Sequence, residues 1–289
     1  MKIGLIDVDG HNFPNLPIMK LSAYHKSLGD KVYWWNGLEH YDRVYMSKVF
    51  TDTPDIEFTI QADEVIRGGT GYDLKNCLPK DVECICPDYS LYPQYNQAYG
   101  FLTRGCPRGC GFCVVAEKEG RKSKQVADLQ DFWVGQKEVK LLDPNLLACR
   151  EHEKLLKQLA DSGAWIDFTQ GLDIRLTTPD NISLLNNIKV KMLHFAWDNP
   201  NDDLTKYFEM FNQYTKVTDC RKKRAYVLTN YNSTHEQDLY RIYTLRDLGY
   251  DPFVMIYDKS NAPKITRRLQ RWCNNKWVFR SCERFEDYK

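Results

Sequence analysis

The chain has 289 residues, of which 43% are hydrophobic, enough for one large domain or two modest ones. Its 40 basic and 39 acidic residues leave a formal net charge of +1, which excludes a global attraction to polyanions, so any nucleic-acid site would be local. No apolar run is long enough to span a bilayer, and the N-terminal sequence MKIGLIDVDG has no signal-peptide layout. We therefore expect a cytoplasmic protein whose ten cysteines are reduced thiols or metal ligands.

The first part of the chain alternates short apolar runs with a helical pattern. Strands are predicted at 2–8, 31–35, 41–47 and 63–69, and a helix at 16–30 is stopped by Gly29. Continuous apolar strands beside a helix predict a parallel sheet, so residues 1–80 are expected to form a small Rossmann-like α/β domain. The segment 81–97 carries prolines and tyrosines without a period and is interpreted as a linker.

A second and longer alternation of apolar, strand-length runs with helical patterns begins at residue 98. Helical patterns at 151–163 and 236–249 each end in glycine, as helix C-termini commonly do. The predicted strands of this part lie at 98–103, 138–143, 165–170, 190–197, 224–230 and 252–258. A complete (β/α)₈ barrel needs about 250 residues, and fewer than 200 follow Tyr95. Six units predict a partial (β/α)₆ TIM-like barrel at 98–289.

Polar residues follow the predicted strands of this second part where each strand ends. Because the carboxyl ends of parallel strands share one face, which is the ligand face in β/α folds, we expect these side chains to lie near one another. Capping of the next helix is the alternative role for each of them. The predicted set comprises Asp143, Asn145, Gln170, Asp173, Arg175, Asp198, Asn199, Asn230, Tyr257 and Asp258.

Three cysteines gather in the sequence RGCPRGCGFCVV, which directly follows the strand predicted at 98–103. Cys106, Cys110 and Cys113 lie in a glycine-rich loop, and no second pair of suitable spacing completes a four-ligand zinc site. A disulfide would leave one thiol over. Three thiolates on one loop can hold three irons of a cubane cluster and leave the fourth iron open to a ligand from outside the protein.

The pattern Cys-x₃-Cys-x-aromatic-Cys after the first strand of a partial β/α barrel resembles the radical S-adenosylmethionine (SAM) superfamily. The resemblance implies that Cys106, Cys110 and Cys113 bind a [4Fe-4S] cluster whose fourth iron binds SAM, with Phe112 packed near the adenine. It implies reductive cleavage of SAM to a 5′-deoxyadenosyl radical that abstracts hydrogen from a substrate. The electron would come from a flavodoxin or ferredoxin.

The resemblance also suggests which polar residues bind SAM or substrate. In LLDPN, Asp143 takes the place of the carboxylate in the family's Gly-Gly-Glu-like segment, although the glycines are missing. From side-chain chemistry, Arg175 is expected to pair with a carboxylate and Asp173 or Gln170 with ribose hydroxyls. Asn230 is expected within reach of SAM or substrate.

The N-terminal part resembles the cobalamin-binding-like domain of one radical SAM subgroup, through GGTGYD at 68–73 and, in the barrel, DFTQGLDIRL at 167–176. Asp9 and His11 keep two residues of the Asp-x-His-x-x-Gly cobalamin motif, but its glycine is absent. Cobalamin binding therefore stays open. So does a second cluster, since methylthiotransferases of similar layout carry three further cysteines, and Cys77, Cys84 and Cys86 here have different spacing.

Two other classes of protein also fit parts of the chain. IGLIDVDG resembles the start of haloacid-dehalogenase-type phosphatases, with Asp7 as nucleophile and Asp9 as acid/base, although the expected later acidic pair at a strand end is missing. A non-catalytic iron-sulfur electron carrier is the second alternative, although it would normally supply four cysteines. Basic runs at 121–124, 221–224 and 267–271 are solvated faces or phosphate contacts. The substrate is not identified.

Overall fold

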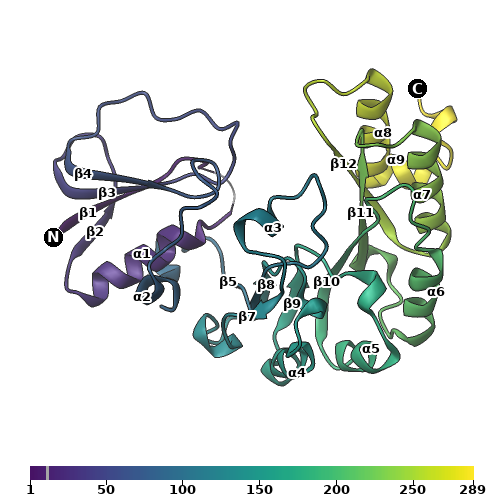
Figure 1. Cartoon of the computed structure of the whole chain (residues 1–289), viewed down its shortest axis with the longest axis horizontal. Helices are drawn as coiled ribbons and strands as arrows, with labels where there is room; N and C mark the ends of the chain where they lie inside the picture. Colours follow the sequence, from purple (N-terminus) through teal and green to yellow (C-terminus); the bar gives the residue numbers. More distant parts are fainter. Residues whose placement is uncertain (11–12) are drawn as a thin grey trace.

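A computed structural model describes residues 1–10 and 13–289 of the chain and shows a mixed α/β fold built on two parallel sheets. His11, predicted from the cobalamin motif, lies outside the described residues. In Figure 1 the smaller, N-terminal sheet lies on the left and the larger sheet toward the right. No helix among the described residues is long and apolar enough to cross a membrane.

The N-terminal sheet has four parallel strands in the order β2-β1-β3-β4. Its strands are β1 (Lys2–Asp7), β2 (Lys31–Trp34), β3 (Tyr41–Ser47) and β4 (Ala62–Gly68). Helix α1 (Leu16–Ser27) begins where the side chain of Asn15 accepts a hydrogen bond from the Ile18 N–H, and it ends before Gly29, whose φ is 81°. All five elements predicted in this part are confirmed.

The segment interpreted as a linker contains the short helix α2 (Lys80–Glu83) and a 3₁₀ turn at Tyr89–Leu91. It touches both sheets. The Tyr92 hydroxyl donates to the Asp7 carboxylate at the end of β1, at 2.9 Å, and the Tyr89 hydroxyl donates to the Phe132 carbonyl beside the larger sheet, at 2.6 Å. The domain boundaries at 80 and 97 stay a prediction.

The larger sheet has six parallel strands in the order β12-β11-β10-β9-β8-β5. Each strand therefore pairs with the strand of this sheet that precedes it along the chain. All six match the predicted strands to within a few residues. The bounds are β5 (Gln97–Gly100), β8 (Glu138–Leu141), β9 (Trp165–Phe168), β10 (Lys189–Ala196), β11 (Lys223–Thr229) and β12 (Asp251–Ile256). β5 and β12 are its edge strands, and the described strands do not close into a barrel.

The helices of this part pack on one face of the larger sheet (Figure 1). Alternate strand residues such as Val139, Ile166, Phe195 and Val227 are buried there in one apolar core. The covering helices are α4 (His152–Ser162), α5 (Pro179–Leu185), α6 (Thr205–Tyr214), α7 (His235–Asp247), α8 (Lys264–Asn274) and α9 (Lys276–Ser281). The glycines predicted to end α4 and α7 both have positive φ.

The opposite face of the larger sheet is polar. Because strand side chains alternate between faces, the residues between the core positions point away from the helices. Register aligns Tyr99 with Lys140, and Lys140 with Asp167. His194 on β10 and Tyr226 on β11 lie next to each other, with their rings stacked, although register aligns Asp167 with Met192. We call this set of five side chains the polar face.

One prediction about the strands needs correction. The single strand expected at 98–103 is interrupted: β5 ends at Gly100, and a separate strand β6 (Thr103–Arg104) pairs antiparallel with β7 (Lys124–Gln125). A Cβ on Gly100 would lie 2.4 Å from the Phe132 ring, so the ring packs directly on the backbone at this point. The chain then leaves the sheet and enters the cysteine loop.

Candidate functional site

The cysteine loop, residues 105–123, is held at both ends by the β6–β7 hairpin and contains the short helix α3 (Val115–Lys118). Its first residue, Gly105, has φ +88°, and a Cβ there would lie 2.3 Å from the Lys122 carbonyl oxygen. Only glycine therefore permits the close approach of the two ends. The Cys106 N–H donates to the Gly120 carbonyl at 3.1 Å and closes the neck of the loop.

Asp143 fastens the chain that leads into this loop. Its buried carboxylate, just after β8, accepts hydrogen bonds from the Leu102 N–H at 3.2 Å, the Thr103 N–H at 2.5 Å and the Thr103 hydroxyl at 2.7 Å. Burial raises the pKa of Asp143 to about 6 despite these donors. The predicted SAM-binding carboxylate is thus already engaged in holding β6.

The three cysteines of the loop are free thiols. Cys106 and Cys110 are half-buried and Cys113 is exposed, and the Cys113 N–H donates to the Cys110 carbonyl at 3.0 Å. Burial raises the pKa of Cys110, and the charges of Cys113 and Cys106 raise it further. The Cys110 thiol therefore lies within electrostatic range of the other two cysteines and of Asp198.

Asn145 contacts Cys106, the first of the three cysteines. Its amide Nδ2 donates to Cys106 Sγ at 3.6 Å, within range for a sulfur acceptor, while its Oδ1 is buried without a hydrogen-bond partner. The residue is only 3% exposed. An unpaired buried carbonyl is costly unless a ligand supplies a donor. Asn145 follows β8 and was expected only as one of many polar strand ends.

The donor set of the loop consists of three thiols. Among the described residues, no three His, Cys, Asp or Glu side chains converge closely enough to hold one metal ion. A zinc ion would need thiolates about 2.3 Å from a single point, whereas a cubane puts each thiolate on a different iron. Three neighbouring thiols on a tightly closed glycine loop, beside an unpaired amide oxygen, fit the second arrangement.

A charged bridge joins the cysteine loop to the turn after β9. Arg108, between the first two cysteines, donates to Asp173 Oδ2 at 2.6 Å, and Arg175 donates to Oδ1 of the same carboxylate at 2.8 Å. Burial alone would raise the pKa of Asp173, but the hydrogen bonds from Arg175 and Arg108 outweigh it and hold the pKa below its usual range. Arg175 also lies 3.4 Å from Asp202.

Aromatic rings complete the surroundings on the side of β11 and β12. Phe112 meets Tyr231 edge-on with ring centroids 5.4 Å apart, and Tyr231 meets Tyr257 at 4.8 Å. A Cβ on Gly111 would lie 2.7 Å from the Tyr231 hydroxyl. Asn230 has φ 62° and donates to the Tyr257 carbonyl at 2.8 Å, which fixes the turn that carries Tyr231.

The structure thus brings several of the predicted strand-end residues to the cysteine loop. Asp173 and Arg175 reach it through Arg108, and Asn230 reaches it through Tyr231. Gln170 is exposed at the end of β9. Burial raises the pKa of Asp198 to about 6, and the charges of Arg241 and Arg175 lower it. Arg108 and Tyr231 were not predicted, because nothing local in the sequence distinguishes an arginine or a tyrosine that contacts a distant loop.

The two aspartates of the phosphatase alternative both have structural partners. Asp7 accepts from Asn15 Nδ2 at 3.2 Å and from the Tyr92 hydroxyl. Asp9 accepts from two backbone N–H groups of the loop after β3 and from the Thr53 hydroxyl at 2.7 Å. Asp202 and Asp203 lie just before α6 rather than as a second acidic pair at the end of a strand.

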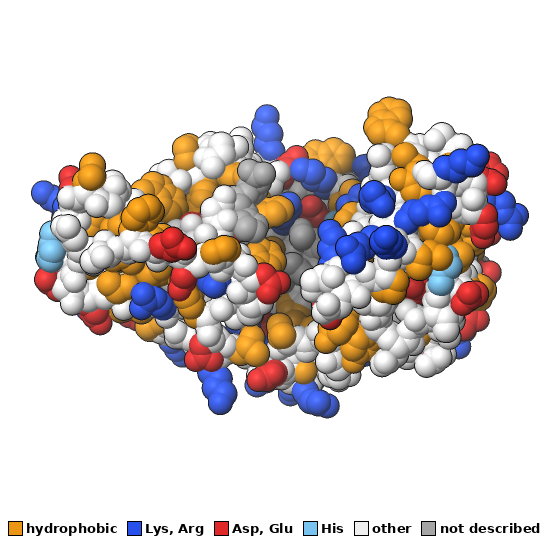
Figure 2. All heavy atoms as spheres, turned by 90° about the horizontal axis from the view of Figure 1, so that it is seen from above, with side chains coloured by type: hydrophobic (Ala, Val, Ile, Leu, Met, Phe, Trp, Pro, Cys, Tyr) orange, Lys and Arg blue, Asp and Glu red, His pale blue; other side chains and the backbone are white. Residues whose placement is uncertain are grey.

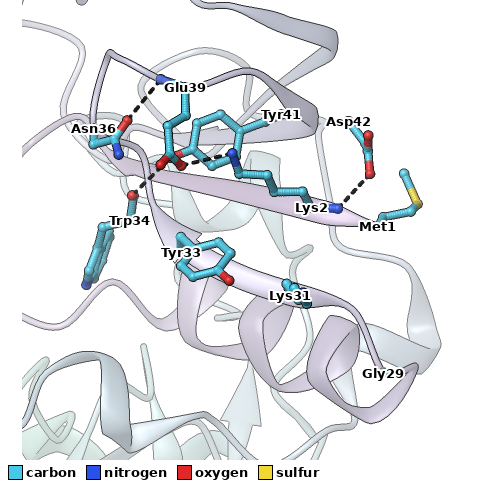
Figure 3. A pocket seen from close by; sticks show the side chains of 10 residues that line it. All are labelled: Met1, Lys2, Gly29, Lys31, Tyr33, Trp34, Asn36, Glu39, Tyr41 and Asp42. Carbon is cyan, nitrogen blue, oxygen red and sulfur yellow. Dashed lines mark hydrogen bonds and ion pairs between the residues drawn. The ribbon is translucent and has the colours of Figure 1, made fainter.

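Two pockets are lined by none of the three loop cysteines. A pocket of about 810 Å³ on the N-terminal sheet is shown in Figure 3, and two of its charged groups are already paired, with Lys2 bound to Glu39 at 2.9 Å. A second pocket of about 700 Å³ includes Lys122 and Lys124 of the basic run at 121–124, together with Arg150. Asp128, Asp131 and Glu151 also line it, so its charges balance.

Of the cysteines considered for a second cluster, Cys77 and Cys84 are exposed and Cys86 is half-buried.

No family model matches the chain, and a search of curated proteins finds no match. Function must therefore be inferred from the residues and their geometry.

Proposed function

We propose that this protein is a radical SAM enzyme and that its six-stranded sheet is an open, partial (β/α)₆ TIM-like barrel. The observation that carries the proposal is the cysteine loop: three free, neighbouring thiols on a glycine-closed loop beside the ends of parallel strands. Strand ends of this kind form the ligand face of β/α folds. Charged and apolar side chains border a hollow in the middle of the molecule on this side (Figure 2).

Cys106, Cys110 and Cys113 would hold a [4Fe-4S] cluster. When bound, the cluster supplies the electron that cleaves SAM and thereby starts hydrogen abstraction from a substrate. The protein contributes position and the exclusion of water. Phe112 and Tyr231 offer apolar ring surface to the adenine, and the Asn145 amide can keep its N–H on the Cys106 sulfur while its free oxygen accepts a ligand N–H.

Arg175 supplies positive charge for a ligand carboxylate. Asp173 engages its Nε and Asp202 lies 3.4 Å from its Nη1, so Nη2 is the part of the guanidinium group that would meet the ligand. Asp143 serves as the anchor of the loop rather than as a direct ligand. The two unpaired edges, β5 and β12, leave the sheet open to a sizeable substrate. We place the reaction in the cytoplasm, where a flavodoxin or ferredoxin would supply the electron.

The experiment is anaerobic reconstitution with iron and sulfide, followed by iron analysis, electron paramagnetic resonance, and measurement of 5′-deoxyadenosine after addition of SAM and dithionite. About four irons per chain are expected, together with a resonance that changes when SAM binds. The triple variant of Cys106, Cys110 and Cys113 to alanine should hold none. A triple variant of Cys77, Cys84 and Cys86 to serine is the matched control and should retain both signals.

Full iron in the first triple variant would refute the assignment of the ligands. Cobalamin binding is tested separately by the visible absorption of the protein after incubation with hydroxocobalamin. A loaded cluster that neither responds to SAM nor yields 5′-deoxyadenosine would favour the non-catalytic electron carrier.

A further inference from the structure

The segment from residue 259 to residue 280 carries positive charge and no acidic residue. We call it the basic segment, and it contrasts with the chain as a whole, whose 40 basic and 39 acidic residues nearly balance. Figure 2 shows Lys and Arg side chains gathered on the side of the molecule that carries α8, beside the central hollow. Such a segment gives a nearly neutral chain one local surface for an anion. Its basic residues are Lys259, Lys264, Arg267, Arg268, Arg271, Lys276 and Arg280.

Other groups of basic residues in the chain have acidic partners. In the basic run at 221–224, Arg221 lies 2.9 Å from Asp219. The run at 121–124 lines a pocket together with three acidic side chains. On the polar face, Lys140 lies 3.9 Å from Asp167. Compensated groups of this kind attract a polyanion only weakly, so the basic segment differs from them in its lack of counter-charge.

Within the basic segment, Lys276 is paired with Asp251 at 2.8 Å. The other six basic residues take part in none of the ion pairs formed by residues 1–10 and 13–289. Four of the six lie on α8 at spacings of three, four and seven residues, so they form one stripe along the helix. We call these four the basic stripe: Lys264, Arg267, Arg268 and Arg271.

The basic stripe repels itself. It contains two pairs of like charges three residues apart and two pairs four residues apart, and each such pair destabilises a helix by about 0.2–0.5 kcal/mol. Lys264 also occupies the first turn of α8, which contains no acidic residue, although acidic side chains are favoured at that end of a helix. An anion bound along the stripe would relieve both penalties.

Two arginines of the stripe are held in place by neighbours that carry no negative charge. Arg267 donates through Nε and Nη2 to the Ala262 carbonyl, at 2.9 Å and 2.8 Å. The Arg268 guanidinium lies 5.1 Å from the ring centroid of Phe285. Both groups therefore keep their full charge in a fixed position, and a guanidinium group that is already oriented loses less conformational entropy when it binds a phosphate.

The shape of the stripe indicates which anion fits it. The apolar residues Leu269, Trp272 and Cys273 of α8 are buried in the core, so this helix has no free apolar face to insert into a lipid surface. From Lys264 to Arg271 the stripe extends about 10 Å, at 1.5 Å per residue. That length is about the axial rise of three nucleotides in one strand of a nucleic acid. A chain of regularly spaced phosphates therefore matches the stripe.

We propose that the basic stripe binds the sugar-phosphate backbone of a nucleic acid, RNA or DNA, with its lysine and arginine side chains on neighbouring phosphates. The basic segment begins two residues after Tyr257, which meets Tyr231 with ring centroids 4.8 Å apart, and Tyr231 in turn meets Phe112 of the cysteine loop. The binding surface is thus connected to the candidate site. Binding itself rests on α8 and does not require the proposed cluster.

The test is fluorescence anisotropy of a labelled RNA strand of about 20 nucleotides, and of the DNA strand of the same sequence, titrated with the full chain at about 50 and 200 mM salt. At the lower salt concentration a Kd between about 1 and 100 μM is expected for at least one strand, and it should rise about twenty- to fiftyfold at the higher one if three or four phosphates are contacted. No binding of either strand, or binding that salt does not weaken, overturns the proposal.

Two further arms identify the partner and the site. Unlabelled polyglutamate of equal charge should displace the strand at least tenfold less effectively than unlabelled nucleic acid, and equal displacement overturns the assignment because an acidic protein would then fit as well. The titrations are run with and without reconstituted iron. Equal binding in both supports the proposal even if the radical SAM assignment fails, whereas binding that requires the cluster overturns it.

A double variant separates binding from folding. Lys264→Gln combined with Arg271→Gln removes two exposed charges, so affinity at the lower salt concentration should fall at least about tenfold and the slope of log K against log salt should become less steep by about 1.4. Urea unfolding should show no loss of stability, because like-charge repulsion is removed. The control, Lys157→Gln combined with Lys216→Gln, removes two exposed charges elsewhere and should retain wild-type binding. Unaltered binding in the first variant, or an equal loss in both, contradicts the proposal.

Discussion

The carboxylate of Asp143 makes the stability of this protein depend on pH in a way that Asp143→Asn should remove. Burial raises its pKa from 3.8 to about 6 in the folded protein. Between these values the folded state binds more protons than the unfolded state, so the contribution to stability is complete below about pH 4 and is lost as the pH rises through about 6. The free energy of unfolding should therefore differ by about 3 kcal/mol between the two ends of this pH range, at 1.36 kcal/mol for each unit of pKa shift.

The assay is urea unfolding of wild type and Asp143→Asn at pH values from about 4.5 to 7.5, with the difference between the two proteins taken at each pH. That difference isolates Asp143, since Asp198, whose pKa burial also raises to about 6, is present in both. Relative to the variant, the free energy of unfolding of wild type should fall by about 2 kcal/mol across this range. Asp161→Asn, as control, should follow wild type.

A parallel pH profile for wild type and Asp143→Asn would refute the reasoning. It would mean that the three donors from Leu102 and Thr103 stabilise the charged carboxylate fully, so that burial costs nothing. The same samples can be tested for iron uptake. The asparagine amide group has only one acceptor oxygen for these donors, so a loosened β6 should also slow cluster loading.

Two further predictions follow from the backbone and from the N-terminal carboxylates. Gly105→Ala puts a Cβ against the Lys122 carbonyl, so it should destabilise the protein by about 2–4 kcal/mol in urea unfolding and abolish iron binding. The control Gly120→Ala, at φ +91° with open space around it, should cost only about 1 kcal/mol. Equal losses of stability in the two variants would contradict the role given to the close contact. Wild type should release no phosphate from p-nitrophenyl phosphate with magnesium, because Asp7 is held by Asn15 and Tyr92; release that Asp7→Asn abolishes would reinstate the phosphatase.

The strands and helices could be predicted well because their signals are local. Parallel strands buried by helices are short continuous apolar runs, and glycines such as Gly163 mark helix ends by a backbone conformation that other residues avoid. The β6–β7 hairpin escaped prediction because each strand has only two residues, too few to show alternation. The break after Gly100 depends on the Phe132 ring, thirty-two positions away.

The candidate site was predictable only where one residue type dictates the chemistry. Cysteines at close spacing are informative by themselves. By contrast, the contact of Arg108 with Asp173 joins residues 65 positions apart, and that of Asn145 with Cys106 joins residues 39 positions apart. The contact between Asp167 and His194, whose side chains lie 3.5 Å apart, could not be foreseen either, because the pairing of side chains on β9 and β10 is a property of the packed sheet.

The order of strands in the larger sheet has a consequence for biosynthesis. Since each strand from β8 to β12 pairs with the one before it, every new β/α unit leaving the ribosome finds its docking edge already made. The three cysteines are synthesised before the turn after β9 that carries Asp173 and long before Tyr231, which follows β11. The nascent chain therefore presents an uncovered cysteine loop, and if the loop holds the proposed cluster, iron could be delivered before its aromatic and charged surroundings are complete.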